Sequence, residues 1–259
     1  MNLKKYIPAI LFLAFSINVS SQINRTDQAG LKQGMWVKNY PNGSKMYDGT
    51  FRDGHPVGEF KRYYETGVLK SIQVFSDNGR QTDATLYFPS GRIASKGRYI
   101  DQKKEGNWQF FPDQNESYLM YEQNFKDDKR DGLSLSFYPD SAIGDRTMYK
   151  NDEKNGDREQ FYNSGAKYTK SLYSAGKLDG LFEAWYEDGN KMYSGVYKND
   201  IRQGLWIIYN EDGSEKYRIN YVNGKPDNSG MDSDASEYIN ALEKEKGSIP
   251  DPEQTGEMW

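Results

Sequence analysis

The chain has 259 residues, of which 36% are hydrophobic and 15% aromatic, with 25 glycines and no cysteine. The absence of cysteine excludes a disulfide framework, a thiolate metal site, a cysteine nucleophile and a lipid-attachment cysteine. Residues 22–226 carry 30 Lys and Arg against 29 Asp and Glu, whereas residues 227–259 carry nine acids against two lysines. Neither part shows the basic stripe that binding to a phosphate backbone requires, so nucleic acid is not an expected partner.

The N-terminus reads as an export signal. Lys4 and Lys5 are followed by an apolar run at 7–15 and by small residues at 19–21, just before Gln22. This order predicts a signal peptide over residues 1–21, and the apolar run is too short to span a bilayer. We therefore expect an exported protein, periplasmic or associated with the outer membrane, with no transmembrane segment in the mature chain.

After a lead-in at 22–33, residues 34–226 divide into eight units of about 24 residues. Seven units begin with a glycine, and Thr82 stands at the remaining start: Gly34, Gly58, Gly106, Gly132, Gly156, Gly180 and Gly204. An aromatic residue follows seventeen residues later in every unit, if a two-residue insertion in the fourth is allowed for: Phe51, Phe75, Tyr99, Phe125, Tyr149, Tyr173, Tyr197 and Tyr221. This fixed register predicts a tandem-repeat architecture.

Each unit is predicted to form a β-hairpin. A first strand runs from the leading glycine to an aromatic pair, a glycine-containing turn such as 40–43 follows, and the second strand carries the recurring aromatic. An Asp- or Asn-rich turn then leads to the next unit. The predicted fold class is all-β: an elongated, twisted single-layer antiparallel sheet of eight tandem hairpins with a short C-terminal helix. Because one layer leaves an aromatic face partly exposed, we expect that face to bind.

No convergent reactive groups stand out. His55 is the only histidine and has no second histidine or cysteine to join it, and the acid pairs 127–128 and 152–153 fall where hairpin turns favour Asp and Asn. We predict no catalytic, cofactor-binding or metal site, and no enzyme activity. The candidate interaction residues are the aromatic side chains Trp36, Phe60, Trp108, Trp185, Trp206, Tyr238 and Trp259.

The acidic tail, residues 227–259, is a separate element. From Ser233 to Lys246 it predicts a helix, with Ser233 as N-cap, an apolar stripe at 235, 238, 239 and 242, and Gly247 after its end. Two interpretations stay open. The helix caps the last repeat and covers its open strand edge, or the helix and Trp259 form a docking peptide for another protein.

Residues 34–226 resemble the variant class of MORN repeats common in bacteria. The resemblance lies in a leading Gly, an aromatic residue two positions on, a Tyr/Phe pair, a turn glycine and a closing aromatic. The resemblance implies consecutive β-hairpins and a role as a scaffold or contact surface. The expected function is a non-catalytic interaction subunit of the bacterial envelope, bound to other envelope proteins in an outer-membrane assembly or transport complex. The alternative is a glycan- or peptidoglycan-binding module that stacks sugars on its aromatic faces.

Overall fold

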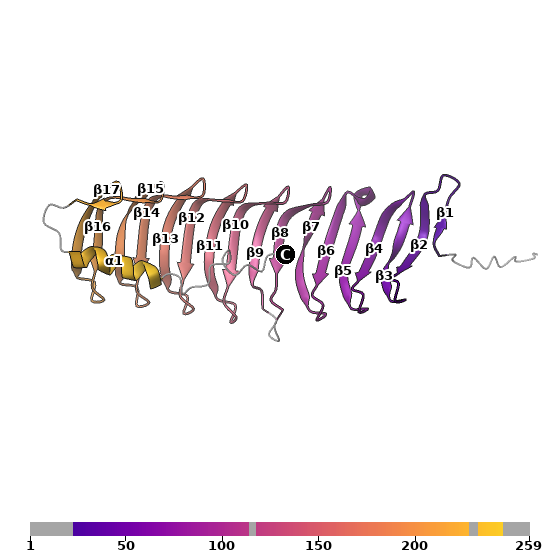
Figure 1. Cartoon of the computed structure of the whole chain (residues 1–259), viewed down its shortest axis with the longest axis horizontal. Coiled ribbons are helices and arrows are strands. Elements are labelled where there is room, and N and C mark those ends of the chain that lie inside the picture. The colour runs from indigo at the N-terminus through magenta and orange to yellow at the C-terminus, as the bar shows by residue number, and fades with distance from the viewer. Residues whose placement is uncertain (1–22, 114–117, 228–232, 246–259) are drawn as a thin grey trace, which may run out of the picture.

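The computed structural model describes residues 23–113, 118–227 and 233–245. The described chain forms a long ribbon of strands with a single short helix against one end (Figure 1). The strands of its first half are β1 (Arg25–Thr26), β2 (Lys32–Asn39), β3 (Lys45–Arg52), β4 (His55–Tyr63), β5 (Leu69–Ser76), β6 (Gln81–Tyr87), β7 (Ile93–Ile100), β8 (Lys103–Phe110) and β9 (Tyr121–Lys126). Those of its second half are β10 (Lys129–Phe137), β11 (Ile143–Lys150), β12 (Glu153–Phe161), β13 (Lys167–Ser174), β14 (Lys177–Trp185), β15 (Lys191–Lys198), β16 (Ile201–Tyr209), β17 (Glu215–Val222) and β18 (Lys225–Pro226). The helices are the 3₁₀ turn η1 (Asp77–Gly79) and α1 (Ser233–Glu245).

Every strand pairs antiparallel with the next one along the chain, so the sheet is an open meander. Each sequence unit supplies one hairpin, from β2–β3 for the first unit to β16–β17 for the eighth. This confirms the predicted fold class, including the short helix.

The leading glycines lie inside the first strands rather than at their start, which corrects the predicted strand boundaries. Gly204, for example, has φ +65° and sits where the pairing of β15 with β16 shifts register. Such a bulge places an extra residue in one strand and bends it, and glycine accepts the positive φ without steric cost. Thr82 stands at the one leading position without a glycine, and there β5 pairs with β6 without any register shift. No bulge is present at that position, so no glycine is required.

The connections between units are tight turns with two successive residues at positive φ. Asp53 and Gly54 have φ values of 51° and 79°, and Asn151 and Asp152 have 51° and 72°. These values are those of a type I′ hairpin turn, which favours Asn, Asp and Gly. The recurring Asp and Asn positions are therefore explained by the turn they occupy.

On one face of the sheet, here called the inner face, large aromatic residues lie opposite glycines of the neighbouring strands. Phe60, Trp108 and Trp206 stand two residues after a leading position, and the residue across from each on the preceding strand is glycine. Gly195 shows why, because a Cβ on it would lie 2.1 Å from Cδ2 of Trp206. The indole thus lies flat on the neighbouring backbone, which leaves Trp206 with 0% of its surface exposed.

Tyrosine hydroxyls join successive hairpins at the opposite end from the type I′ turns. The Tyr64 hydroxyl donates to the Tyr87 carbonyl oxygen at 2.7 Å, and Tyr162 donates to Trp185 in the same way at 2.9 Å. The equivalent bonds of Tyr40 and Tyr138 are both 2.8 Å long. Each bond crosses from one unit to the next, so the repeat period itself is stabilised by side-chain contacts.

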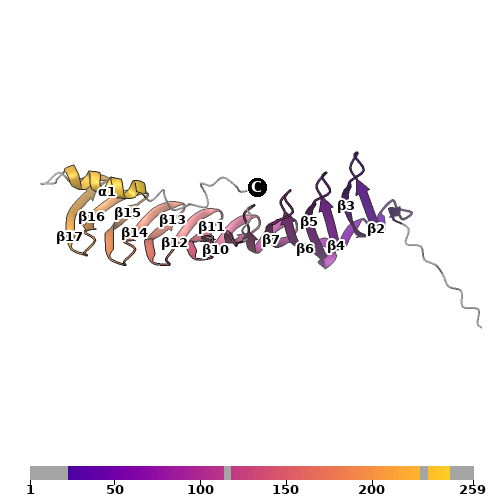
Figure 2. The ribbon, with the colours of Figure 1, turned by 90° about the horizontal axis from the view of Figure 1, so that it is seen from below.

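Helix α1 packs on the inner face at the C-terminal end of the sheet, over β13–β17 (Figures 1 and 2). Ala235 and Ile239 are fully buried in one cluster with Tyr193, Trp206 and Ile208. The helix therefore packs on the last repeats, as the first of the two interpretations has it, but it covers the face of the sheet rather than its edge. The physical reason is that the apolar surface of the last repeats lies on this face.

Candidate functional site

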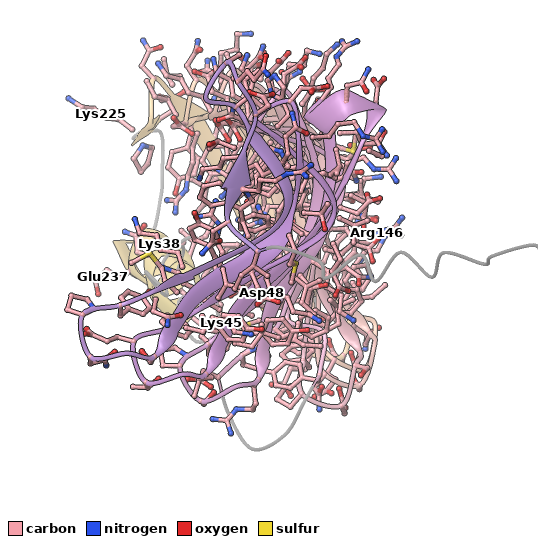
Figure 3. All side chains as sticks on the ribbon, turned by 90° about the vertical axis from the view of Figure 1, so that its right-hand side faces the viewer. Lys38, Lys45, Asp48, Arg146, Lys225 and Glu237 are labelled. Carbon is pink, nitrogen blue, oxygen red and sulfur yellow. The ribbon has the colours of Figure 1, made fainter. Side chains whose placement is uncertain are left out.

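The two faces of the sheet differ in what they offer to a partner. Looking along the sheet, Lys38 and Glu237 lie on the inner side, whereas Arg146 projects from the other side, here called the outer face (Figure 3). The inner face holds the aromatic core and α1. An exposed binding surface of apolar character must therefore be sought on the outer face, since core side chains are already in contact.

Five aliphatic side chains make an exposed row across β11–β16 of the outer face. They are Met148, Leu172, Leu181, Val196 and Leu205, with 38, 40, 52, 43 and 47% of their surfaces exposed, and are here called the aliphatic stripe. Leu181 and Val196 are direct cross-strand partners. In the second, third and fourth units, five of the six corresponding positions are polar, namely Glu59, Asp83, Arg98, Asn107 and Asn124, and the sixth is Val74, 43% exposed. The aliphatic residues thus gather in the C-terminal half, where Asp157 on β12 interrupts the row, and an apolar row of this kind on a sheet face is a candidate contact site.

Ion pairs border the aliphatic stripe on both sides. Towards the type I′ turns, the Lys150 and Lys198 ammonium groups each lie 3.0 Å from a carboxylate, of Asp131 and Asp179 respectively. On the other side, Lys191 lies 2.8 Å from Glu183. An apolar centre with a charged rim is the usual anatomy of a protein–protein contact surface.

The inner face carries the aromatic row and, in contact with it, a row of basic residues. These residues, here called the cation ladder, stand two positions before the leading glycine of their units: Lys32, Lys104, Arg130, Lys154 and Arg202. Each stacks on the recurring aromatic of its own unit, as Lys104 Nζ does 4.9 Å from the centre of the Phe125 ring and the Arg130 guanidinium 4.2 Å from that of Tyr149. The near-neutral composition of the repeats conceals this row.

Burial changes the acid–base behaviour of groups on the inner face. Desolvation lowers the pKa of Lys104, opposed by the charge of Asp128. Under α1, desolvation raises the pKa of Tyr186, and a hydrogen bond with Tyr238 of the helix raises it further. Both shifts report how far these side chains are withdrawn from water.

The middle of the inner face is polar rather than aromatic. Arg158 takes the place of the aromatic residue, and its Nε lies 2.8 Å from Oδ2 of Asp145, while the Thr147 hydroxyl donates to Asp145 Oδ1 at 2.5 Å. Gln123, 3% exposed, has an amide oxygen that accepts no hydrogen bond from the residues described. Ser134 and Arg158, which stand in their units where Trp108 and Trp206 stand in theirs, thus mark a buried polar stretch between two aromatic ones.

Three of the predicted interaction residues belong to the core. Phe60, Trp108 and Trp206 have 4, 0 and 0% of their surfaces exposed. Their rings contact other rings of the same face, as in the pair Tyr99–Trp108 with centres 4.8 Å apart. A partner cannot reach them without opening the sheet. The expectation that the single layer leaves this aromatic face exposed is therefore corrected, because the strands bend and α1 covers one end.

Three other predicted interaction residues, Trp36, Trp185 and Tyr238, are half-buried. Trp36 donates its indole N–H to the Arg25 carbonyl oxygen at 3.1 Å, and Trp185 lies 5.6 Å from the Lys167 ammonium group. Tyr238 lies on α1 and is stacked under Lys216 at 3.7 Å. Trp259 is outside the described residues, so its predicted docking role stays a prediction.

The polar groups considered for chemistry are dispersed. His55 is exposed at the first position of β4. The acid pair 127–128 occupies one type I′ turn, and of the pair 152–153 the first residue lies in another such turn and the second begins β12. Within residues 23–113, 118–227 and 233–245, no group of three or more His, Cys, Asp or Glu side chains is placed to hold a metal ion. Over the same ranges, no helix has the length and apolar character needed to cross a membrane.

Sequence reasoning missed the aliphatic stripe, although a signal for it exists. Each stripe residue is the immediate neighbour of a recurring aromatic position, as Leu181 is of Phe182 and Val196 of Tyr197. Because side chains alternate along a strand, a residue beside a core aromatic must face the opposite way. Large aliphatic residues at such positions indicate an exposed apolar surface.

A family model matches the chain at two of its hairpins. Residues 56–77 and 178–199 match the family described as MORN repeat variant, and these stretches are the hairpins β4–β5 and β14–β15. No curated protein matches the chain. Among solved structures, the crystal structure of TcdB2-TccC3-Cdc42 is similar over 75% of this chain and 12% of its own, with 10% identity and a TM-score of 0.22.

Proposed function

We propose that this chain is a non-catalytic scaffold built of MORN-type repeats, and that it binds a partner protein of the bacterial envelope through the aliphatic stripe. MORN repeats are in general interaction repeats for proteins or membranes. The observation that carries the proposal is the concentration of exposed aliphatic side chains on one half of one face, with ion pairs at its rim.

The location of the partner follows from the N-terminal sequence. Residues 1–21 have the order of a signal peptide, with basic, apolar and small-residue parts. An exported scaffold meets envelope proteins, among them the subunits of outer-membrane and transport assemblies. The absence of catalysis is part of the same proposal, and it is supported by the dispersal of the acids over separate hairpin turns.

The burial of the candidate interaction residues weighs against the alternative of glycan binding. Trp206 is fully buried, so a sugar cannot stack on it, and Trp185 is half-buried. An aromatic platform for sugars needs an exposed ring face. We therefore favour the protein partner.

The test is cross-linking in native membranes followed by purification of the intact chain and mass spectrometry. Lys150 and Lys198, which border the stripe, are expected to link to one partner protein. Lys61 and Lys96, on the outer face of the N-terminal half, serve as controls that stay unlinked. Recovery of the chain only as a free monomer, or links spread evenly over both halves, contradicts the proposal.

A further inference from the structure

The aliphatic stripe of the outer face is long and only one residue wide. On β14, Leu181 has Asp179 on one side and Glu183 on the other, and both acids belong to ion pairs of the rim. From β11 to β16 the stripe crosses the sheet in five steps, about 24 Å at about 4.8 Å between neighbouring strands. A second sheet packs through a broad apolar face. The stripe is too narrow for that, and its shape is that of a contact with one segment laid across the strands.

A helix fits such a stripe better than an extended segment does. An extended segment on a sheet face would press unpaired main-chain N–H and C=O groups against aliphatic side chains, whereas a helix pairs these groups internally. A helix advances about 5.4 Å per turn. Strands lie about 4.8 Å apart, so successive turns meet successive strands, and the two repeats drift by only about 3 Å over five steps.

The chain itself contains one example of this packing. Helix α1 runs across the strands on the inner face of the last repeats (Figures 1 and 2). Its contacts are made by side chains three or four residues apart: Ala235 and Ile239 are fully buried, and Tyr238 and Leu242 pack against the same cluster. The outer face of these repeats offers a second apolar row that runs in the same direction.

One carboxylate interrupts the row without a cation of its own. Asp157 on β12 is exposed and is the direct cross-strand partner of Leu172 on β13. Glu59 and Asp83 hold the same place in their own units, and each has a cation 2.7 Å away. Asp157 makes no such ion pair with any residue that the structure describes. Within the row it is therefore an uncompensated negative charge.

We propose that the partner presents an amphipathic α-helix that lies across β11–β16 on the aliphatic stripe, with a Lys or Arg where the helix passes Asp157. The inference rests on the proposed function, because it names the kind of segment that the stripe binds. About 16 residues cover 24 Å at about 1.5 Å per residue. Apolar side chains of four successive turns cover β16, β15, β14 and β13, and the next turn brings the basic residue to β12.

Site-specific photo-cross-linking of the intact chain in native membranes measures the form of the bound segment. Met148 and Leu205, at the two ends of the stripe, are each replaced by p-benzoylphenylalanine, and the linked residues of the partner are identified by mass spectrometry. A helix places the two linked residues about 16 apart in one segment, whereas an extended segment spans the same distance with about seven. The same replacement of Val74, exposed on this face outside the stripe, is the matched control and should give no link.

Charge variants test the basic residue of the helix. Asp157→Lys should weaken binding of the partner by about tenfold, because it sets two like charges against each other. Replacing the partner's basic residue by Glu should restore binding to the Asp157→Lys chain. Glu59→Lys makes the same change at the same place of the second unit, outside the stripe, and should leave binding unchanged.

The outcomes separate this inference from the proposed function. Linked residues about seven apart, or drawn from segments distant in the partner sequence, overturn the helix but leave the stripe as a contact surface. Links between two copies of this chain overturn the partner helix in favour of self-association. Equal binding by the Asp157→Lys and natural chains overturns the basic residue. The absence of any link at both Met148 and Leu205 contradicts the proposed function, and this inference with it.

Discussion

Replacing Gly195 by alanine tests how the inner face is packed. The added Cβ would lie 2.1, 2.2 and 2.5 Å from three ring atoms of Trp206. The ring has no room to move, because Tyr193 is stacked on one side with centres 6.2 Å apart and Phe182 lies 6.4 Å away. Overpacking a tight core costs about 1–3 kcal/mol, and the closeness of this contact places the expected loss at about 3 kcal/mol.

The measurement is equilibrium urea unfolding followed by circular dichroism on the single and double variants. Trp206→Ala alone is expected to cost about 3–5 kcal/mol through the cavity it leaves. In that background Gly195→Ala should cost close to nothing, so the two changes are strongly non-additive. Gly144→Ala is the matched control, since its Cβ meets a Tyr138 ring atom only at 3.2 Å. Additive costs, or a loss at Gly144 as large as that at Gly195, would refute the packing argument.

Three further changes probe other parts of the repeat. Gly204→Ala forces a side chain to φ +65° and should lower the free energy of urea unfolding by about 1–2 kcal/mol. Thr82→Gly, at a position without positive φ, should lower it by no more than about 1 kcal/mol. A larger loss for Thr82→Gly than for Gly204→Ala would contradict the bulge explanation. Arg158→Ala leaves the Asp145 carboxylate buried without its cation and should lower the free energy of unfolding by about 3–5 kcal/mol. Adding Asp145→Ala to the same chain should recover most of that stability. A small loss in the single variant would contradict the burial of this pair. Burial raises the pKa of Tyr162 from 10.0 to about 12, so the folded state holds the phenol proton more tightly than the unfolded state. The free energy of unfolding should therefore fall as pH rises from 10 towards 12, and Tyr162→Phe should weaken that fall. An unchanged pH profile in the variant would refute the assignment.

Much of the fold follows from the register of glycines and aromatics. The hairpin in each unit, the turns and the helix were predictable because each depends on local chemistry, such as positive φ at Asp53 and Gly54. The strand boundaries were less so. The leading glycine looks like the end of a turn in sequence, and only the pairing of β15 with β16 shows it to be a bulge within a strand.

The binding surface was harder to predict than the sheet. Large aromatics at a regular spacing suggest contact residues, yet Trp108 and Trp206 are buried by the bend of their strands and by rings from neighbouring units. Burial of this kind depends on partners 10 to 24 residues away, which no single unit contains. The aliphatic side chains beside those aromatics, such as Leu181, are the ones left in solvent.

The most direct test of the proposed function is the recovery of a partner by two matched variants of the full chain from native membranes. Leu181→Ser with Leu205→Ser removes two exposed members of the aliphatic stripe, whereas Val74→Ser removes an equally exposed aliphatic side chain outside it, 43% exposed on the same face. Neither change should alter unfolding by more than about 0.5 kcal/mol, because the side chains are on the surface. The stripe variant should lose the partner recovered with the natural chain and with Val74→Ser. Equal recovery by both variants would contradict the assignment of the stripe as the contact surface.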